Sequence, residues 1–178
     1  MRSGGREEPS CVFPDASGGG SRYPHGGRAM FVPMELSRVL ILDSSPEQFV
    51  TLTEQGGPRS FAIKIGTAEA IAIERRLRGD APPRPQTHEL LESTIAALGG
   101  ELEKVVIHSL EHGTFFARLV IRQNGETVEV DARPSDALAL SVSRRTPIEV
   151  DEDVVREASD ERPDILPPIE SGEEDDDA

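Results

Sequence analysis

The dipeptide Asn124-Gly125 limits the possible folds more than any other feature, because it separates two runs in which apolar and polar residues alternate. Asn-Gly is the preferred pair for a two-residue hairpin turn, and a period of two is typical of a half-buried β-strand. The two runs cover residues 114–122 and 126–133. The side chains predicted to face inward are Phe115, Ala117, Leu119, Ile121, Val128, Val130 and Ala132. The chain must therefore contain an antiparallel hairpin.

Other segments show either a strand period or a helical period. Strands are predicted at 32–42, 48–53, 59–65, 105–110 and 147–150. Helices are predicted from a Thr67 cap to Gly79, over 88–98 after a Thr87 cap, from Pro134 or Ser135 to Arg145, and from Asp151. Hairpins outnumber possible crossovers. The pattern therefore predicts one α+β domain, with an antiparallel or mixed sheet and three to four helices.

The two ends of the chain lack an apolar period. Residues 1–29 combine glycine runs with prolines and scattered polar residues, and residues 159–178 finish in Glu173-Glu174-Asp175-Asp176-Asp177. Such segments cannot bury enough apolar surface to offset their ordering entropy. We therefore predict a disordered leader at 1–29, a folded domain at 30–158 and a disordered acidic tail at 159–178.

The net charge of −14 does not decide the function. Residues 151–178 carry 2 basic and 13 acidic residues, which account for −11 of the −14. Residues 31–150 carry 13 basic and 17 acidic residues. A near-neutral domain neither requires nor excludes nucleic acid as a partner.

Cys11 is the only cysteine, which removes any internal disulfide and fits a reducing compartment. No stretch approaches the roughly 20 apolar residues of a membrane span, and the first ten residues lack the apolar centre of a secretory signal. We therefore expect a cytoplasmic protein with no membrane partner.

The densest polar cluster is the string DARPSDA, from Asp131 to Ala137, at a predicted strand-to-helix junction. Asp131 and Arg133 are two apart on the strand and should share a face, while Ser135 and Asp136 fall in a helix's first turn, where free N–H groups attract anions. Two interpretations stay open. These residues bind a phosphate, with Asp131 and Asp136 holding a divalent cation. Alternatively, they form a surface ion pair and an ordinary helix cap.

His88 opens the second predicted helix, where the macrodipole favours a neutral imidazole that could accept a proton or bind a metal. The alternative is a histidine that simply pairs with a nearby carboxylate or backbone group. The sequence HELLE has Glu92 where a zinc protease motif requires a second histidine, so that class of site is excluded here.

Four strings resemble, in order, the signatures of the bifunctional nuclease (BFN domain) family: IGTAEA at 65–70, PRPQTHELL at 83–91, GTFFARL at 113–119 and DARPSDA at 131–137. The strings lie between residues 65 and 137, and the resemblance as a whole covers roughly residues 31–155. Glu69 matches the glutamate of the family's IG-x-x-E signature. The sequence departs from many relatives at 61–64, where Phe-Ala-Ile-Lys replaces a leucine, a proline and an aromatic residue.

Members of this family are reported to have DNase and RNase activity, so the resemblance implies a nuclease. Under this hypothesis the catalytic residues are Asp131, Arg133, Asp136, His88 and Glu69, with Arg84 and Ser135 binding substrate and Asp131 and Asp136 holding a divalent metal. No organic cofactor is expected. The partners would be DNA or RNA, and a homo-oligomer of the chain is a further option. The alternative function is a non-catalytic regulatory or assembly module that binds a phosphorylated ligand or a partner protein.

Overall fold

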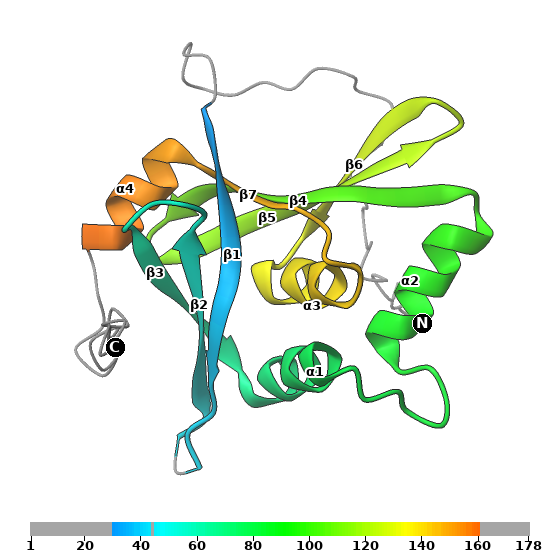
Figure 1. The fold of residues 1–178 in the computed structure, drawn as a ribbon, viewed down its shortest axis with the longest axis horizontal. Coiled ribbons are helices and arrows are strands. Elements are labelled where there is room, and N and C mark those ends of the chain that lie inside the picture. Colours follow the sequence, from blue (N-terminus) through cyan, green and yellow to red (C-terminus); the bar gives the residue numbers. More distant parts are fainter. Residues whose placement is uncertain (1–29, 44, 161–178) are drawn as a thin grey trace, which may run out of the picture.

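The computed structural model describes residues 30–43 and 45–160, which form seven strands and four helices (Figure 1). The strands are β1 (Phe31–Leu40), β2 (Glu47–Glu54), β3 (Ser60–Gly66), β4 (Gly100–Glu111), β5 (Thr114–Gln123), β6 (Glu126–Ala132) and β7 (Ile148–Asp151). The helices are α1 (Thr67–Arg78), α2 (Thr87–Ala97), α3 (Pro134–Arg144) and α4 (Glu152–Asp160). This arrangement confirms the predicted α+β class. The predicted leader at 1–29 and the tail beyond Asp160 lie outside the described residues.

The described strands form one mixed sheet in the order β3-β2-β1-β7-β4-β5-β6. Neighbouring strands run antiparallel except β7 and β4, which run parallel. The β5–β6 hairpin turns at Asn124 and Gly125, both with positive φ (53° and 85°), as the type I′ turn requires. The predicted hairpin is therefore confirmed in its strands and in its turn.

The sheet is strongly bent, so that β1–β3 cross β4 and β5 at a steep angle and α3 lies between the two halves (Figure 1). Bulges interrupt β1 between Leu36 and Arg38 and β4 at two points, and bulges increase the local twist. α3 is the central helix because its middle is small and apolar: Ala137, Leu138 and Ala139 have no exposed surface. α1 packs against α3, while α4 contributes Val154 and Val155 to the core at the other end.

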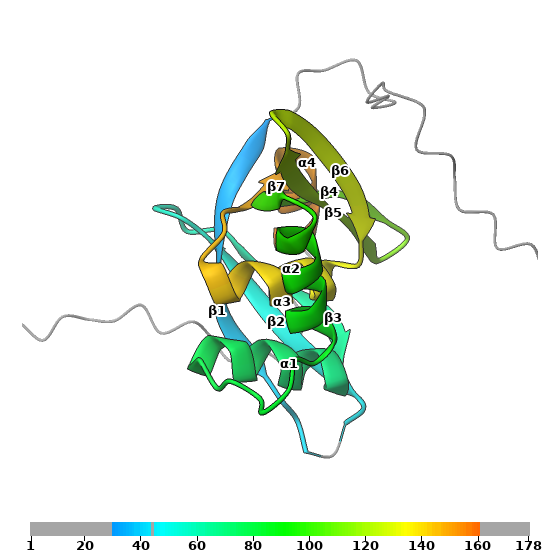
Figure 2. The same ribbon diagram turned by 90° about the vertical axis from the view of Figure 1, so that its right-hand side faces the viewer.

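α2 is peripheral. Figure 2, which views the molecule from the side that carries α2, shows this helix in front of α3 and above α1. None of its residues is buried. Within the described ranges, no helix is long and apolar enough to cross a membrane.

The prediction that Val128 and Val130 of β6 face the interior is wrong. Val128 and Val130 pair with the buried Ile121 and Leu119 of β5 and share their face, yet 40% and 41% of their surfaces are exposed. The physical reason is position, since β6 is the last strand of the sheet and lies at its edge. A period of two indicates which side chains share a face but not whether another layer covers that face.

The three predicted helix caps are each displaced by one or two residues. The N-caps are Gly66 for α1, Gln86 for α2 and Arg133 for α3, so Thr67, Thr87 and Ser135 lie inside the first turns. Pro134 explains the last case, because proline is favoured at the first helical position, which makes the residue before it the cap. Ser135 is therefore the second helical residue and is buried.

Candidate functional site

The N-termini of α1, α2 and α3 converge on one locus. Each helix has an acidic residue at its third position, namely Glu69, Glu89 and Asp136. Arg133, the N-cap of α3, contacts both Glu69 and Asp136, and His88 of α2 contacts Asp136. We call these four residues (Glu69, His88, Arg133 and Asp136) the Arg133 cluster. All four were predicted as site residues, and the tertiary structure brings them together.

Arg133 forms the centre of the cluster. Its Nε and Nη2 atoms donate to the two carboxylate oxygens of Asp136 at 2.9 and 3.2 Å, and its Nη1 atom donates to Glu69 Oε1 at 3.0 Å. The Asp136 carboxylate raises the pKa of Arg133 further above its ordinary range. The Arg133 side chain is still 66% exposed, so its outer surface can meet a ligand from solvent.

Asp136 links Arg133 to His88. Partial burial raises the pKa of Asp136, but hydrogen bonds from Arg133 and His88 outweigh burial and leave the pKa below its ordinary value. An ionised carboxylate can only accept, so His88 Nε2, 3.1 Å from Asp136 Oδ1, carries the proton of this contact. In the neutral imidazole the Nδ1 atom is then a proton acceptor, held in orientation by Asp136.

Glu69 reaches Arg133 because Gly66 has no side chain. The Glu69 carboxylate folds back over the start of α1, and a Cβ added at Gly66 would lie 2.4 Å from Glu69 Oε2. The backbone of Gly66 is ordinary extended chain (φ −78°), so glycine is required here for close approach and not for its conformational freedom. This contact gives a physical reason for the glycine and glutamate of the IG-x-x-E signature.

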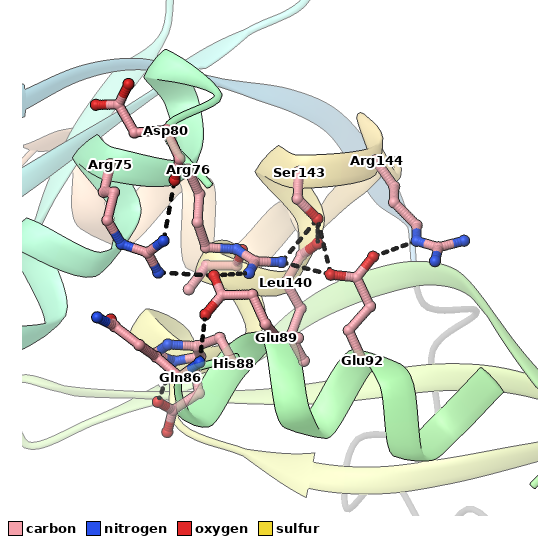
Figure 3. A network of polar contacts seen from close by, with 12 residues as sticks. Arg75, Arg76, Asp80, Gln86, His88, Glu89, Glu92, Leu140, Ser143 and Arg144 are labelled. Atoms are coloured by element: carbon pink, nitrogen blue, oxygen red, sulfur yellow. Dashed lines mark hydrogen bonds and ion pairs between the residues drawn. The ribbon is translucent and has the colours of Figure 1, made fainter. Parts of the chain in front are cut away.

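A second polar cluster, which the sequence did not predict, attaches α2 to α1 and α3 (Figure 3). Its centre is Arg76, whose side chain is only 4% exposed. Its guanidinium donates to Glu89 Oε1 at 2.6 Å and Glu92 Oε2 at 2.7 Å on α2, and to Ser143 Oγ at 2.7 Å and the Ala139 carbonyl at 2.6 Å on α3. We call this set the Arg76 network; its members are Arg75, Arg76, Glu89, Glu92, Ser143 and Arg144.

The outer members strengthen the Arg76 network. Arg75 donates to Glu89 at 2.6 Å, and Arg144 donates to Glu92. Burial raises the pKa of Glu89, but hydrogen bonds from Arg75, Arg76 and the Gln86 backbone outweigh it and lower the pKa to about 2. One feature of the sequence could have indicated this network. Arg76 lies three residues after the buried Ile73 and six after the buried Ala70, on the helix face that should be apolar.

The remaining predicted residues do not belong to the Arg133 cluster. Asp131 lies opposite Arg118 in the β5–β6 ladder, where Arg118 also pairs with Glu129 at 3.5 Å. Burial and the charge of Arg118 lower the pKa of the neighbouring His108. The negative charge of Asp131 partly counteracts this lowering. The ion pairs that the structure shows for Arg133 are with Glu69 and Asp136, and Asp131 is not among them.

Two further observations concern ligands. Within residues 30–43 and 45–160, no group of three or more His, Cys, Asp or Glu side chains is placed to hold a metal ion. A cavity of about 510 Å³ lies between the C-terminal half of α2, the start of β4 and the end of α3, and no member of the Arg133 cluster lines it. The member of the Arg133 cluster that is most open to solvent is Arg133 itself, whose side chain is 66% exposed.

The arrangement favours a bound phosphate. An exposed guanidinium lies at the N-terminus of α3, where the positive end of the helix dipole attracts anions. The imidazole of His88, oriented by Asp136, lies next to it and is a candidate proton acceptor. Glu69 and Asp136 oppose an incoming anion, so we expect a phosphate to bind Arg133 tightly only when one of these carboxylates moves away.

Comparisons with known proteins point to one family. A model of the bifunctional nuclease domain matches residues 50–162. A Mycobacterium tuberculosis protein described as uncharacterized is 43% identical over 123 residues, which cover 69% of this chain and 70% of that protein. Bifunctional nuclease 1 of Oryza sativa subsp. japonica is 29% identical over 118 residues, and bifunctional nuclease 2 is 25% identical over 114. These matches cover 64% and 62% of this chain but only 36% and 35% of the rice proteins.

Proposed function

This chain belongs to the bifunctional nuclease domain family, and from that premise we propose that it hydrolyses phosphodiester bonds of DNA or RNA at the Arg133 cluster. The observation that carries the proposal is the convergence of three helix N-termini on an exposed arginine and an oriented histidine. The lone Cys11 suggests that this activity belongs in a reducing compartment such as the cytoplasm.

In the proposed mechanism, Arg133 binds a non-bridging oxygen of the scissile phosphate after Asp136 or Glu69 is displaced. His88 Nδ1 accepts the proton of the attacking water as the new P–O bond forms, and Asp136 stabilises the resulting imidazolium. The P–O bond to the leaving oxygen breaks, and that oxygen takes a proton from solvent. Arg84, which is exposed and has no ion pair within the described residues, is free to bind a neighbouring phosphate. Ser135 would contribute through its own backbone N–H, because the N–H groups of Asp136 and Ala137 donate to the Arg133 carbonyl.

The divalent cation stays a prediction. Asp136 is engaged by Arg133 and His88, and a cation at Asp131 and Asp136 would have to replace those contacts. If both carboxylates hold one cation, Asp131→Asn and Asp136→Asn should each reduce Mg²⁺- or Mn²⁺-dependent cleavage by orders of magnitude. Full activity of Asp131→Asn would remove Asp131 from the site.

The central experiment measures cleavage of labelled single-stranded DNA and RNA by the highly purified full chain, with Mg²⁺, with Mn²⁺ and with EDTA. Arg133→Lys should lower kcat/KM at unchanged melting temperature, because lysine keeps the charge but cannot donate through a fork. Arg38→Lys is the matched control, since Arg38 is also exposed and lies on β1. Equal activity of the two variants would contradict the role given to Arg133.

The second candidate function is a non-catalytic module that binds a phosphorylated ligand or a partner protein. It is favoured by the two carboxylates that already neutralise Arg133. Nucleic acid or phosphate that binds at the Arg133 cluster without being cleaved under any metal condition would establish this function in place of the nuclease.

A further inference from the structure

The amphipathic character of α2 is reversed relative to the molecule. Its polar residues His88, Glu89 and Glu92 face the body of the protein, where they contact Asp136 and the Arg76 network (Figure 3). Its apolar residues face outward at the spacing of one helical stripe. They are Leu90, Leu91, Ala97 and Leu98. A surface helix normally turns such a stripe toward the core.

The stripe is extensively exposed. Leu90 is 61% exposed and Leu98, the C-cap, is 68% exposed. Thr94, in the middle of the stripe, donates its hydroxyl to the Leu90 carbonyl of its own helix, so its polar group is satisfied without solvent. The hydroxyl does not interrupt the apolar character of the stripe.

β6 begins close to the C-terminus of α2. Gln123 of β5 donates to the Leu98 carbonyl at 2.8 Å, and its ladder partner on β6 is Glu126. Ile95 of α2 and Ile121 of β5 both approach Gly100, and Ile121 pairs with the exposed Val128. We define the α2–β6 patch as Leu90, Leu91, Ala97, Leu98, Val128 and Val130. Exposed apolar areas of this kind mark interaction sites.

Two unpaired charges lie at opposite ends of α2. Arg84 precedes the helix. Glu126 lies near the C-terminus of the helix, because its ladder partner Gln123 donates a hydrogen bond to the Leu98 carbonyl. Both are exposed, and neither forms an ion pair with any residue of the described ranges. If two copies of α2 pack antiparallel about a two-fold axis, Arg84 of one copy comes opposite Glu126 of the partner subunit. The helix dipoles are then also antiparallel.

We propose that the α2–β6 patch is the interface of a two-fold symmetric dimer of this chain. A two-fold interface requires a surface that is complementary to itself, and the patch meets this requirement through its shared apolar stripe and its opposite end charges. The dimer would also cover the outer side of the helix that carries His88. This inference does not depend on the proposed nuclease activity. In the dimer, Arg84 would bind a phosphate only by giving up its pair with Glu126 of the partner subunit.

The first test measures mass by sedimentation equilibrium of the full chain over about 1–100 µM, a range that detects micromolar association. The double variant Leu90→Ser/Leu98→Ser should raise the dimer dissociation constant by at least about a hundredfold, because four leucines per dimer lose their burial. Ile71→Ser is the matched control, since Ile71 is 51% exposed on α1. Circular dichroism melts verify that the variants fold.

The second test is a charge exchange. Arg84→Glu and Glu126→Arg should each weaken the dimer by about threefold to tenfold, and the double exchange should restore it, because only then do opposite charges face each other again. A monomer at every concentration, which includes the case where the chain's own terminal segments cover the patch, would overturn the proposal. So would a ring of three or more copies, or a dimer indifferent to the leucine and charge changes.

Discussion

Replacing Arg76 with methionine should test whether α2 is attached chiefly by the Arg76 network. Methionine has a helix propensity close to that of arginine and fills part of its volume, so helix α1 itself should persist. The variant loses the four hydrogen bonds that Arg76 donates to Glu89, Glu92, Ser143 and Ala139. The two carboxylates keep one guanidinium each, from Arg75 and Arg144.

The expected cost follows from these contacts. A hydrogen bond to a charged group contributes about 1.5–3 kcal/mol, and a buried ion pair broken on one side costs about 3–5 kcal/mol. The retained partners of Glu89 and Glu92 reduce this penalty, so we expect a loss of about 3 kcal/mol. For a domain of this size, that loss corresponds to a melting temperature lower by about 10 °C.

The assay is urea unfolding followed by circular dichroism, with a thermal melt as the second measurement. Arg78→Met is the matched control, because Arg78 lies on the same helix, is 65% exposed and, among the described residues, pairs only with Glu74. An exposed pair of this type contributes about 0.5 kcal/mol or less. If the two variants lost equal stability, the Arg76 network would not be what holds α2 in place.

Three further predictions follow from the same contacts. The pKa of Glu89 is lowered to about 2 in the folded chain, so its stabilising effect should be complete above about pH 4.5 and disappear as pH falls toward 2. Over this pH window, the urea midpoint of Glu89→Gln should therefore fall less than that of the unchanged chain. Parallel curves of midpoint against pH would refute the assignment. Gly66→Ala should force Glu69 away from Arg133 and alter activity or phosphate binding more than the melting temperature, since φ at Gly66 suits alanine; a large loss of stability with unchanged binding would contradict this. Removing residues 161–178, which carry eight acidic residues and one arginine, should strengthen the binding of labelled single-stranded DNA in fluorescence anisotropy at low salt, and unchanged affinity would show that the acidic residues do not compete.

The parts of the fold that depend on local chemistry could be predicted from the sequence. Asn124-Gly125 determined the β5–β6 turn because few other pairs accept two successive positive φ angles. In the predicted strand at 59–65, Phe61, Ile63 and Ile65 occupy alternate positions, and all three lie in the core, as a period of two indicates. Four residues of the candidate site were also identified from the sequence, since each lies in the first turn of a helix or at its cap.

Long-range geometry decided the rest. Val128 and Val130 have the pattern of core residues. They remain 40% and 41% exposed because β6 is the edge strand of the sheet. Asp131 and Asp136 are near neighbours in sequence, yet one faces Arg118 on the sheet while the other turns with α3 toward Arg133 and His88.

The sequence by itself determined the strands, the helices, the hairpin turn and the family signatures, because these depend on residues within a few positions of one another. Only the tertiary structure decided that three helix N-termini meet at Arg133 and that α2 turns its charged face inward. The reason is that Arg76 is separated by 13 and 16 residues from Glu89 and Glu92 and by 67 from Ser143. No local pattern can indicate that a buried arginine will bind partners so distant in the chain, and those partners reverse the face that α2 presents to solvent.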